Sequence, residues 1–322
     1  MASLLSVENL QVQFQTKKGI NTAVDGVSFS VEKGRILGIV GESGCGKSVT
    51  SMSILQLLGS NARISGGSIK LDGKELIGLP EKEMCRIRGN DIAMIFQDPM
   101  TALNPTLTIG TQLMEPIMLH QNCGKKEAWT RAVDVLKRVG IAAPEKRMKE
   151  YPHQLSGGMR QRVMMAMAVS CEPRLLIADE PTTALDVTIQ AQILELMCEL
   201  REKMGTAIML ITHDMGVVAE TADDVLVLYA GKAVEYGSIE DIFERPKHPY
   251  TQGLLNSIPR LDEDVELLNT IEGTVPAPDA MPAGCRFAPR CPYGKDRCMK
   301  EKPGVYHAGN SLVSCFRYEG EK

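Results

Sequence analysis

The eight residues Gly41–Ser48, Gly-Glu-Ser-Gly-Cys-Gly-Lys-Ser, constrain the fold more than any other feature of this chain. They match the pattern G-x-x-x-x-G-K-[ST], in which backbone N–H groups and a helix N-terminus surround phosphate groups. The apolar run Arg35–Val40 before the loop is typical of a buried strand, and Val49–Leu58 after it has helical periodicity. Strand, glycine-rich loop and helix are the context that the pattern requires, so the sequence predicts an α/β fold with a phosphate-binding loop.

Within this loop we predict that Lys47 reaches the terminal phosphates of a nucleotide and that Ser48 ligates Mg²⁺. An ordinary glycine turn before a helix is the alternative, and the flanking strand and helix argue against it. The predicted nucleotide-binding residues are Gly41, Glu42, Ser43, Gly44, Cys45, Gly46, Lys47, Ser48 and Val49. Cys45 lies at the helix N-terminus, where thiol pKa values fall, so its oxidation is expected to block nucleotide binding. A tolerated small residue is the simpler interpretation of Cys45.

A second apolar strand, Leu175–Ala178, is followed by Asp179 and Glu180. A strand of this kind holds an acidic residue at the carboxyl edge of the sheet, where nucleotides bind. Asp179 suits the Mg²⁺ shell, and Glu180, which points elsewhere, suits the polarisation of an attacking water. A solvated acidic strand end without a catalytic role is the alternative.

Helical and strand patterns alternate along the chain and predict a mainly parallel sheet flanked by helices. The further strand patterns are Leu5–Phe14, Ala23–Val31, Ala207–Ile211 and Val225–Tyr229. The helical patterns are Ile109–His120, Lys125–Val139, Met159–Ser170 and Thr188–Lys203. Residues 98–157 form a helical insertion, and beyond about residue 245 a proline- and cysteine-rich texture predicts a small loop-rich module.

Charge and hydropathy argue against two classes of protein. The formal net charge is −4 and the pI about 5.8, without a dense Lys/Arg block, so the electrostatic pattern of a nucleic-acid binder is missing. No apolar run approaches the ~20 residues of a membrane span, and the first residues lack the pattern of a signal peptide. We therefore expect a cytoplasmic protein that meets a membrane only through partners.

The segment Leu155–Arg162, Leu-Ser-Gly-Gly-Met-Arg-Gln-Arg, places a hydroxyl and two glycines at a helix start, which is again an anion-binding geometry. Together with the phosphate loop and the acidic strand, it makes the chain resemble the ATP-binding cassette (ABC) ATPases. In that family this segment is the signature sequence. The resemblance also implies that Gln97 is the Q-loop glutamine, His213 the switch histidine, and Asp186 part of the D-loop of a cassette dimer.

The resemblance assigns further roles to residues of this chain. It implies that two cassettes dimerise head to tail, with each ATP between the phosphate loop of one and the signature sequence of the other. The residues that would bind ATP in trans are Ser156, Gly157, Gly158 and Gln161. The catalytic residues would be Glu180, His213 and Gln97, and the Mg²⁺ ligands would be Ser48, Gln97 and Asp179.

The fold that the resemblance implies is a P-loop NTPase cassette over residues 1–245. It has a RecA-like core sheet with helices, an antiparallel N-terminal β part and a helical signature subdomain at about 98–157. One departure concerns the adenine base, because many cassettes place an aromatic residue before the third strand to stack on it. This chain reads Gly19–Val24 at that place, and Ile20 or Phe14 would be a poor substitute.

Two further segments, Ile92–Pro105 and His248–Leu255, resemble the ATPases of oligopeptide, dipeptide and nickel importers. The second segment would begin that group's C-terminal extension, here residues 246–322. The resemblance implies an ATP-hydrolysing subunit that drives uptake of di- or oligopeptides at the cytoplasmic face of a bacterial inner membrane. Its partners would be a second ABC ATPase, identical or related, two membrane permeases and an extracytoplasmic substrate-binding protein.

Several alternatives to peptide import stay open. Nickel and glutathione importers share these motifs, because other subunits select the substrate. A soluble ABC ATPase of DNA repair or translation usually has two cassettes or a long coiled coil, which this chain lacks. An iron–sulfur redox or sensor protein regulated by its ATPase is disfavoured, because the sequence indicates no second redox centre.

Four cysteines of the C-terminal module, Cys285, Cys291, Cys298 and Cys315, have five, six and sixteen residues between successive members. A metal centre would stabilise a module too small for a large core. Four thiolates suit Zn²⁺ or a [4Fe-4S] cluster, and the spacing alone does not decide between them. Some peptide-importer ATPases carry an iron–sulfur cluster on such cysteines, which favours [4Fe-4S]. Four unligated thiols are the remaining alternative.

Overall fold

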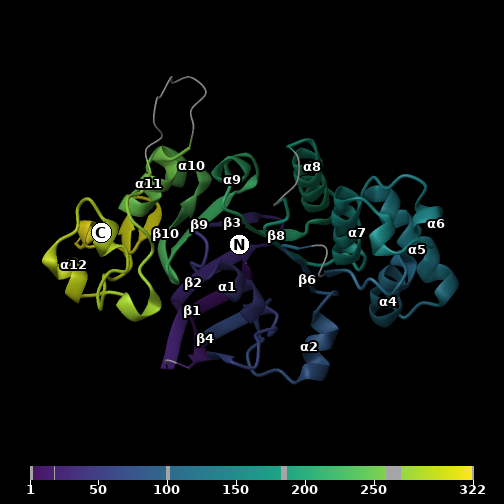
Figure 1. The fold of residues 1–322 in the computed structure, drawn as a ribbon, viewed down its shortest axis with the longest axis horizontal. Coiled ribbons are helices and arrows are strands. Elements are labelled where there is room, and N and C mark those ends of the chain that lie inside the picture. Colours follow the sequence, from purple (N-terminus) through teal and green to yellow (C-terminus); the bar gives the residue numbers. More distant parts are fainter. Residues whose placement is uncertain (1–2, 18, 99–101, 183–186, 259–269, 321–322) are drawn as a thin grey trace. The chain divides into compact units, whose positions relative to one another are not determined.

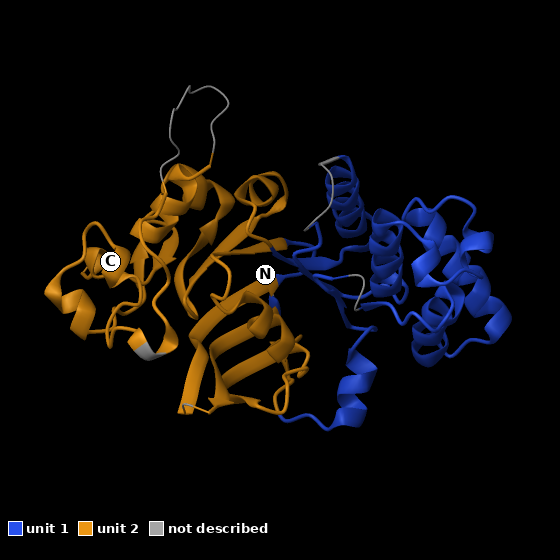
Figure 2. Ribbon diagram, viewed as in Figure 1, with its two compact units in different colours: residues 1–4, 32–35, 78–211 blue, residues 5–31, 36–77, 212–322 orange. Residues whose placement is uncertain are grey.

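The structure is a computed structural model of the chain, and it describes residues 3–17, 19–98, 102–182, 187–258 and 270–320. The chain divides into two compact units, coloured separately in Figure 2. The first unit contains residues 1–4, 32–35 and 78–211, and the second contains residues 5–31, 36–77 and 212–322. The predicted boundary near residue 245 lies inside the second unit.

The second unit contains a four-stranded sheet in the order β2-β1-β4-β5. The strands are β1 (Ser3–Thr16), β2 (Gly19–Glu32), β4 (Ala62–Leu71) and β5 (Lys74–Glu75), and Figure 1 shows them close to the N-terminus. β1 pairs with β4 antiparallel, and its alternating residues Leu5, Val7 and Val12 are buried. This alternation confirms the two N-terminal strands predicted from period-two patterning, and both are longer than predicted.

The same unit contains the strand that leads into the phosphate loop. β3 (Ile36–Val40) is buried throughout and pairs parallel with β9 (Asp224–Tyr229). β10 (Lys232–Ser238) pairs antiparallel with β9 on one side and with β12 (Ser311–Val313) on the other, and β11 (Tyr306–Ala308) pairs with β12. The C-terminal module therefore extends the sheet, which its irregular sequence did not predict.

Helix α1 (Lys47–Ile54) follows the phosphate loop and is shorter than the predicted Val49–Leu58. Gln56 adopts a left-handed φ of 50°, and the N–H of Leu57 donates to the carbonyl of Met52 at 2.8 Å. These are the features of a Schellman C-cap, which normally uses glycine. The apolar periodicity continued past the cap, so the pattern predicted too long a helix.

The other helices of the second unit are short: α9 (Met215–Thr221), α10 (Ile239–Glu244), α11 (Pro249–Asn256) and α12 (Asp296–Lys300). His248 caps α11 by accepting a hydrogen bond from the Tyr250 N–H at 3.1 Å, and Pro249 occupies the first helical position. The His-Pro-Tyr segment is thus a helix start, which buries the Tyr250 ring.

The first unit contains three parallel strands in the order β8-β7-β6. They are β6 (Ile92–Ile95), β7 (Leu175–Asp179) and β8 (Ala207–Ile211), and they confirm the predicted parallel sheet. The helices are α2 (Glu81–Ile87), α4 (Ile109–Gln121), α5 (Lys125–Arg138), α6 (Pro144–Arg147), α7 (Gly157–Val169) and α8 (Val187–Met204). Helices α4, α5 and α7 contact one another (Figure 1).

The length and hydropathy of a helix decide whether it can cross a lipid bilayer. Among the helices of the described residues, none is both long and apolar enough to cross a lipid bilayer.

Candidate functional site

The phosphate loop follows β3 and is shaped by glycines that no other residue replaces easily. Gly41 has a φ of 149°, and a Cβ on it would lie 2.1 Å from the carbonyl oxygen of Leu228 in β9. Gly46 has a φ of 100°, and its Cβ would lie 3.0 Å from the carbonyl oxygen of Ala23 in β2. The loop is therefore held between the backbones of two strands, which fixes the direction of its N–H groups.

Lys47 is the first residue of α1, and only 5% of it is exposed. Its Nζ donates to the carbonyl oxygens of Gly41 at 2.7 Å and Glu42 at 3.2 Å. The ammonium group thus lies within the loop, on the side where a helix N-terminus adds positive potential. Ser48, beside it, is exposed at the start of the helix. A glycine-rich loop followed by the Lys47 ammonium and the Ser48 hydroxyl suits a phosphorylated ligand with Mg²⁺.

The environment of the Cys45 thiol differs from the one predicted for a reactive cysteine. Its side chain is 1% exposed, and its Sγ lies 3.9 Å from Lys47 Nζ. Burial raises the pKa of this thiol above its usual value, and the nearby ammonium lowers it less than burial raises it. The expectation of a reactive thiolate is therefore wrong, and the tolerated small residue is the interpretation that the structure favours.

The acidic pair lies at the carboxyl end of β7 in the first unit. Asp179 is the last strand residue and is 4% exposed, whereas Glu180 is half-buried with a left-handed φ of 48°. Gln97 Nε2 donates to Glu180 Oε2 at 2.9 Å. Because β6 and β7 are parallel neighbours, the residues that follow them emerge at the same edge of the sheet. The structure thus brings together two of the three predicted catalytic residues.

The signature segment forms the start of α7. Ser156 is the N-cap and its hydroxyl accepts from the N–H of Met159 at 3.4 Å, while Ser156 and Gly157 are exposed. A Cβ on Gly157 would have no heavy atom within 4 Å, so this helix start is open. Gln161 is different, because only 2% of it is exposed and its Nε2 donates to the carbonyl oxygen of Pro181 at 2.5 Å. Gln161 therefore connects α7 to the segment after β7.

His213 and Asp186 are the remaining predicted residues. His213 follows β8 along the chain, belongs to the second unit and is exposed. Its neighbour Asp214 caps α9 by accepting from the N–H groups of Gly216 and Val217. Asp186 of the predicted D-loop lies outside the described residues.

One contact of the phosphate loop has no counterpart in the predictions. Arg290, from the C-terminal module, forms an ion pair with Glu42 in which Nη1 donates to both carboxylate oxygens, at 3.0 Å to Oε1 and 2.9 Å to Oε2. The N–H of Glu42 donates to the hydroxyl of Tyr250 at 2.9 Å. These partners lie more than 200 residues from Glu42 along the chain, so no spacing pattern signalled them.

The four C-terminal cysteines, together with His248, line a single cavity of about 80 Å³. Burial raises the pKa of Cys285 to about 11, and the neighbouring thiols Cys315 and Cys291 act in the same direction. In the part of the chain that the structure describes, no three His, Cys, Asp or Glu side chains are arranged to hold a metal ion. The structure therefore brings the thiols to one cavity but does not support the predicted metal centre.

Comparisons with protein families match two segments of the chain. Residues 24–183 match the model of the ABC transporter family, and residues 234–298 match that of the oligopeptide/dipeptide transporter C-terminal region. The chain is 56% identical to the oligopeptide transport ATP-binding protein AppD of Bacillus subtilis (strain 168), covering 100% of this chain and 98% of that protein. It is 51% identical to the oligopeptide transport ATP-binding protein OppD of Escherichia coli (strain K12), covering 98% and 93% respectively.

Solved structures with the same architecture include the ATP-binding cassette MJ0796, as a dimer in a post-hydrolysis state with ADP and Pi. Its TM-score is 0.66 at 27% identity, covering 73% of this chain and 98% of that one. CbiO1 of Clostridium perfringens, part of the ABC transporter complex cbiONQ, has a TM-score of 0.64 at 28% identity, covering 76% and 92%. Both likenesses agree with the predicted P-loop cassette fold.

Proposed function

The chain belongs to the ABC transporter family, as one of the oligopeptide and dipeptide transport ATP-binding subunits, and from this premise we propose how its residues divide the work. It is the ATP-hydrolysing subunit of a peptide importer, and its activity is coupled to transport. The observation that carries our assignment of roles is the 2.9 Å hydrogen bond between Gln97 and Glu180 at the end of β7.

In the proposed mechanism the phosphate loop binds the phosphates of ATP, and Glu180 orients the attacking water. The N–H groups of Gly41–Val49 and the Lys47 ammonium hold the phosphates of ATP. Ser48, Asp179 and Gln97 would hold Mg²⁺, which supplies charge neutralisation for the phosphates. Their oxygen donors suit this ion. The Gln97 amide fixes the Glu180 carboxylate, and that carboxylate accepts a hydrogen bond from the attacking water.

The second cassette and His213 complete the proposed site. The exposed start of α7, with Ser156, Gly157 and Gly158, would contact the ATP of the partner cassette in a head-to-tail dimer. Gln161 would support this contact indirectly, because its amide is bonded to Pro181 of its own chain. His213 would contact the terminal phosphate, and Asp186 would lie at the dimer contact.

The family defines the general assembly, which contains paired ATPases and membrane permeases. We propose a peripheral position at the cytoplasmic face of the membrane, and delivery of peptide by an extracytoplasmic binding protein. Peptide import is favoured over nickel or glutathione import by the names of the relatives. We also propose that residues 1–245 form the cassette, with its helical subdomain at 98–157, and that residues 246–322 form the extension.

The assignment of Glu180 is tested with Glu180→Gln, which keeps the size of the side chain and removes its charge. We expect the kcat for ATP hydrolysis to fall at least 100-fold, with ATP affinity within about threefold of the original protein. Glu172→Gln, an exposed residue of the same unit, is the matched control. Hydrolysis by Glu180→Gln at the original rate would assign the water to another residue.

For the cysteine cavity we propose a [4Fe-4S] cluster bound by Cys285, Cys291, Cys298 and Cys315, with Zn²⁺ as the alternative. The four thiols are soft donors and line one cavity, although in the described residues no three of them are arranged to hold a metal ion. A cluster would supply cross-linking of the module, with no role in phosphate chemistry. Protein purified without oxygen should contain about four irons and four sulfides per chain. Zinc without iron in that sample would contradict the cluster.

A further inference from the structure

The ion pair between Arg290 and Glu42 is among the most buried charged contacts of the second unit. Only 6% of the Arg290 side chain and 28% of the Glu42 side chain are exposed. Nη1 donates to both carboxylate oxygens of Glu42, so the pair combines charge attraction with two hydrogen bonds. Glu42 is the second residue of the phosphate loop, so the contact reaches the nucleotide-binding segment directly.

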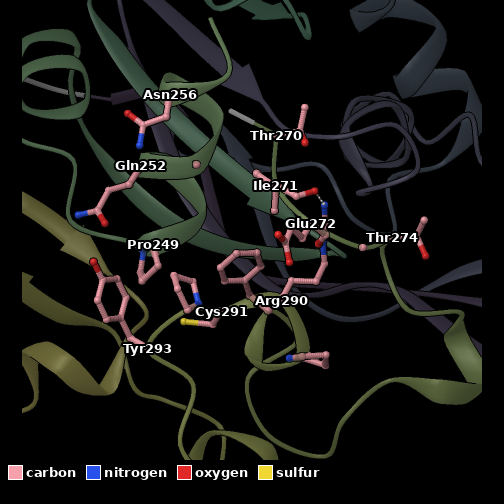
Figure 3. Close-up of a pocket in the computed structure, with 15 residues that line it drawn as sticks. Pro249, Gln252, Asn256, Thr270, Ile271, Glu272, Thr274, Arg290, Cys291 and Tyr293 are labelled. Carbon is pink, nitrogen blue, oxygen red and sulfur yellow. Dashed lines mark hydrogen bonds between the residues drawn. The ribbon is translucent and has the colours of Figure 1, made fainter. Parts of the chain in front are cut away.

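The guanidinium of Arg290 is itself fixed by the main chain. Its Nε donates to the carbonyl oxygen of Glu272 at 2.9 Å, and its Nη2 donates to that of Ile271 at 3.1 Å. Figure 3 shows Arg290 pointing to these residues, with Cys291 beside it on the wall of a cavity of about 720 Å³. All three nitrogens of the guanidinium therefore have partners, and the main-chain carbonyls that hold Nε and Nη2 orient Nη1 toward Glu42.

A second contact supports the same residue of the loop. The N–H of Glu42 donates to the Tyr250 hydroxyl, and the Tyr250 ring packs on Tyr229 and Phe287 with centroids 4.6 and 5.4 Å apart. The Tyr250 and Phe287 rings are almost fully buried. Glu42 is thus held at its side chain by Arg290 and at its main chain by a packed aromatic cluster.

Arg290 and Phe287 belong to one short turn, residues 285–291, that begins and ends with a cysteine of the cavity. The turn is closed by hydrogen bonds from the Ala288 N–H to the Cys285 carbonyl and from the Cys291 N–H to the Ala288 carbonyl. Two cysteines of the cavity and Arg290, whose side chain pairs with Glu42 of the phosphate loop, therefore lie within seven consecutive residues. A displacement at Cys291 moves the adjacent Arg290, because they share a peptide bond.

We propose that Arg290 is a positioning residue for ATP, which holds Glu42 and couples the turn 285–291 to the shape of the phosphate loop. This proposal rests on the proposed function only in that the loop binds ATP. Coupling is reciprocal, so ATP must stabilise the turn to the same extent that the turn stabilises the ATP-binding loop. If the ion pair only stabilised the fold, its removal would change neither the affinity for ATP nor the response of the turn to ATP.

The first test measures the equilibrium Kd for ATP of the full chain and of Arg290→Gln. We expect a Kd about 10-fold higher for the variant, with the kcat at saturating ATP within about twofold. Glu42→Gln should raise the Kd similarly, and the double variant should be no weaker than either single one, because both remove the same contact. Arg290→Lys, which keeps the charge but lacks the planar donors bonded to the Glu272 and Ile271 carbonyls, should have a Kd between those of Arg290→Gln and the original protein.

Arg297→Gln is the matched control, because Arg297 also precedes a cysteine of the cavity but pairs with the exposed residues Glu301 and Glu319. Its Kd should stay within about twofold of the original value. Circular dichroism and thermal unfolding identify any variant that fails to fold, and Arg290→Lys then carries the comparison. Equal Kd values for Arg290→Gln, Arg290→Lys and the original chain would overturn the proposal.

The second test measures amide hydrogen exchange in residues 285–291 with and without ATP. We expect ATP to slow exchange there in the original chain and in Arg297→Gln, and to have no effect in Arg290→Gln. Unchanged exchange in the original chain at saturating ATP would also overturn the proposal. Failure of the original chain to bind ATP would instead contradict the proposed function, so the two failures are distinct.

Discussion

The phosphate loop and the carboxylate edge of β7 hold their functional groups by different means. In the loop, glycine geometry, the backbones of β2 and β9, and buried contacts from Arg290 and Tyr250 define the shape. At the carboxylate edge, Gln97 is exposed, and its hydrogen bond to Glu180 joins two side chains. The phosphate loop is therefore held by several buried contacts, whereas the Gln97 side chain is exposed, and we expect it to rearrange more readily than the loop when ATP and a partner cassette bind.

The largest expected effect concerns the phosphate loop. Gly41→Ala places a Cβ 2.1 Å from the Leu228 carbonyl oxygen at a left-handed φ, so the loop must shift. We expect a loss of at least 100-fold in ATP affinity and about 3 kcal/mol or more in the free energy of unfolding. Urea unfolding and ATP titration measure both.

Gly44→Ala is the matched control in the same loop. Gly44 also has a positive φ, 76°, but a Cβ there would have no heavy atom within 4 Å. We expect it to cost about 1 kcal/mol from backbone strain alone. If both variants lost the same stability, the loop would not depend on contact with β9. The contrast between the phosphate loop and the carboxylate edge would then be wrong.

The second expected effect is a pH dependence of the buried support behind the loop. His248 is buried, and burial lowers its pKa to about 3, so it stays neutral in the folded chain and accepts the hydrogen bond from the Tyr250 N–H. The unfolded chain binds this proton near pH 6.5. The contribution of His248 to the free energy of unfolding is therefore full above about pH 6.5. It falls as the pH drops toward 3, by up to about 1.4 kcal/mol per pH unit.

His248→Asn tests this effect, because asparagine also caps helices but does not titrate in this range. Urea unfolding at several pH values between 4 and 7 should show a shallower slope for the variant than for the original chain. The stability of α11 at pH 7 should change little. Parallel slopes for both proteins would show that His248 is not the source of the pH dependence.

The smallest expected effect concerns the carboxylate edge. Gln97→Ala removes the hydrogen bond to Glu180, so we expect the kcat for ATP hydrolysis to fall about 10-fold. The free energy of unfolding should stay within about 0.5 kcal/mol, because the side chain is exposed. Gln192→Ala, another exposed glutamine of the same unit, is the control and should leave kcat unchanged.

A loss of stability in Gln97→Ala as large as that in Gly41→Ala would contradict the contrast between the two regions. An unchanged kcat would remove Gln97 from the catalytic group and leave Glu180 to act without it.

The sequence predicted the order and type of most core elements, and it failed at particular places. Parallel strands β7 and β8 were recovered to within a residue, because their apolar runs are short and bounded. The end of α1 was missed because Gln56 adopts the left-handed conformation usually left to glycine. β12 was not predicted because a strand of three residues is too short to show a period-two pattern. The raised pKa of Cys45 depends on its burial, which the motif does not encode.

The phosphate loop, the acidic strand end and the family could be predicted from the sequence alone, because each depends on motifs whose residues are close together in the chain. Glycines at set positions, a lysine and a hydroxyl specify one local backbone path, and this path is the site. Three contacts became visible only in the folded chain: the bond of Gln97 to Glu180, the shared cavity of the four cysteines, and the ion pair of Arg290 with Glu42. Arg290 and Glu42 are 248 residues apart in the sequence, and they are joined by packing of the C-terminal module, which no local pattern records.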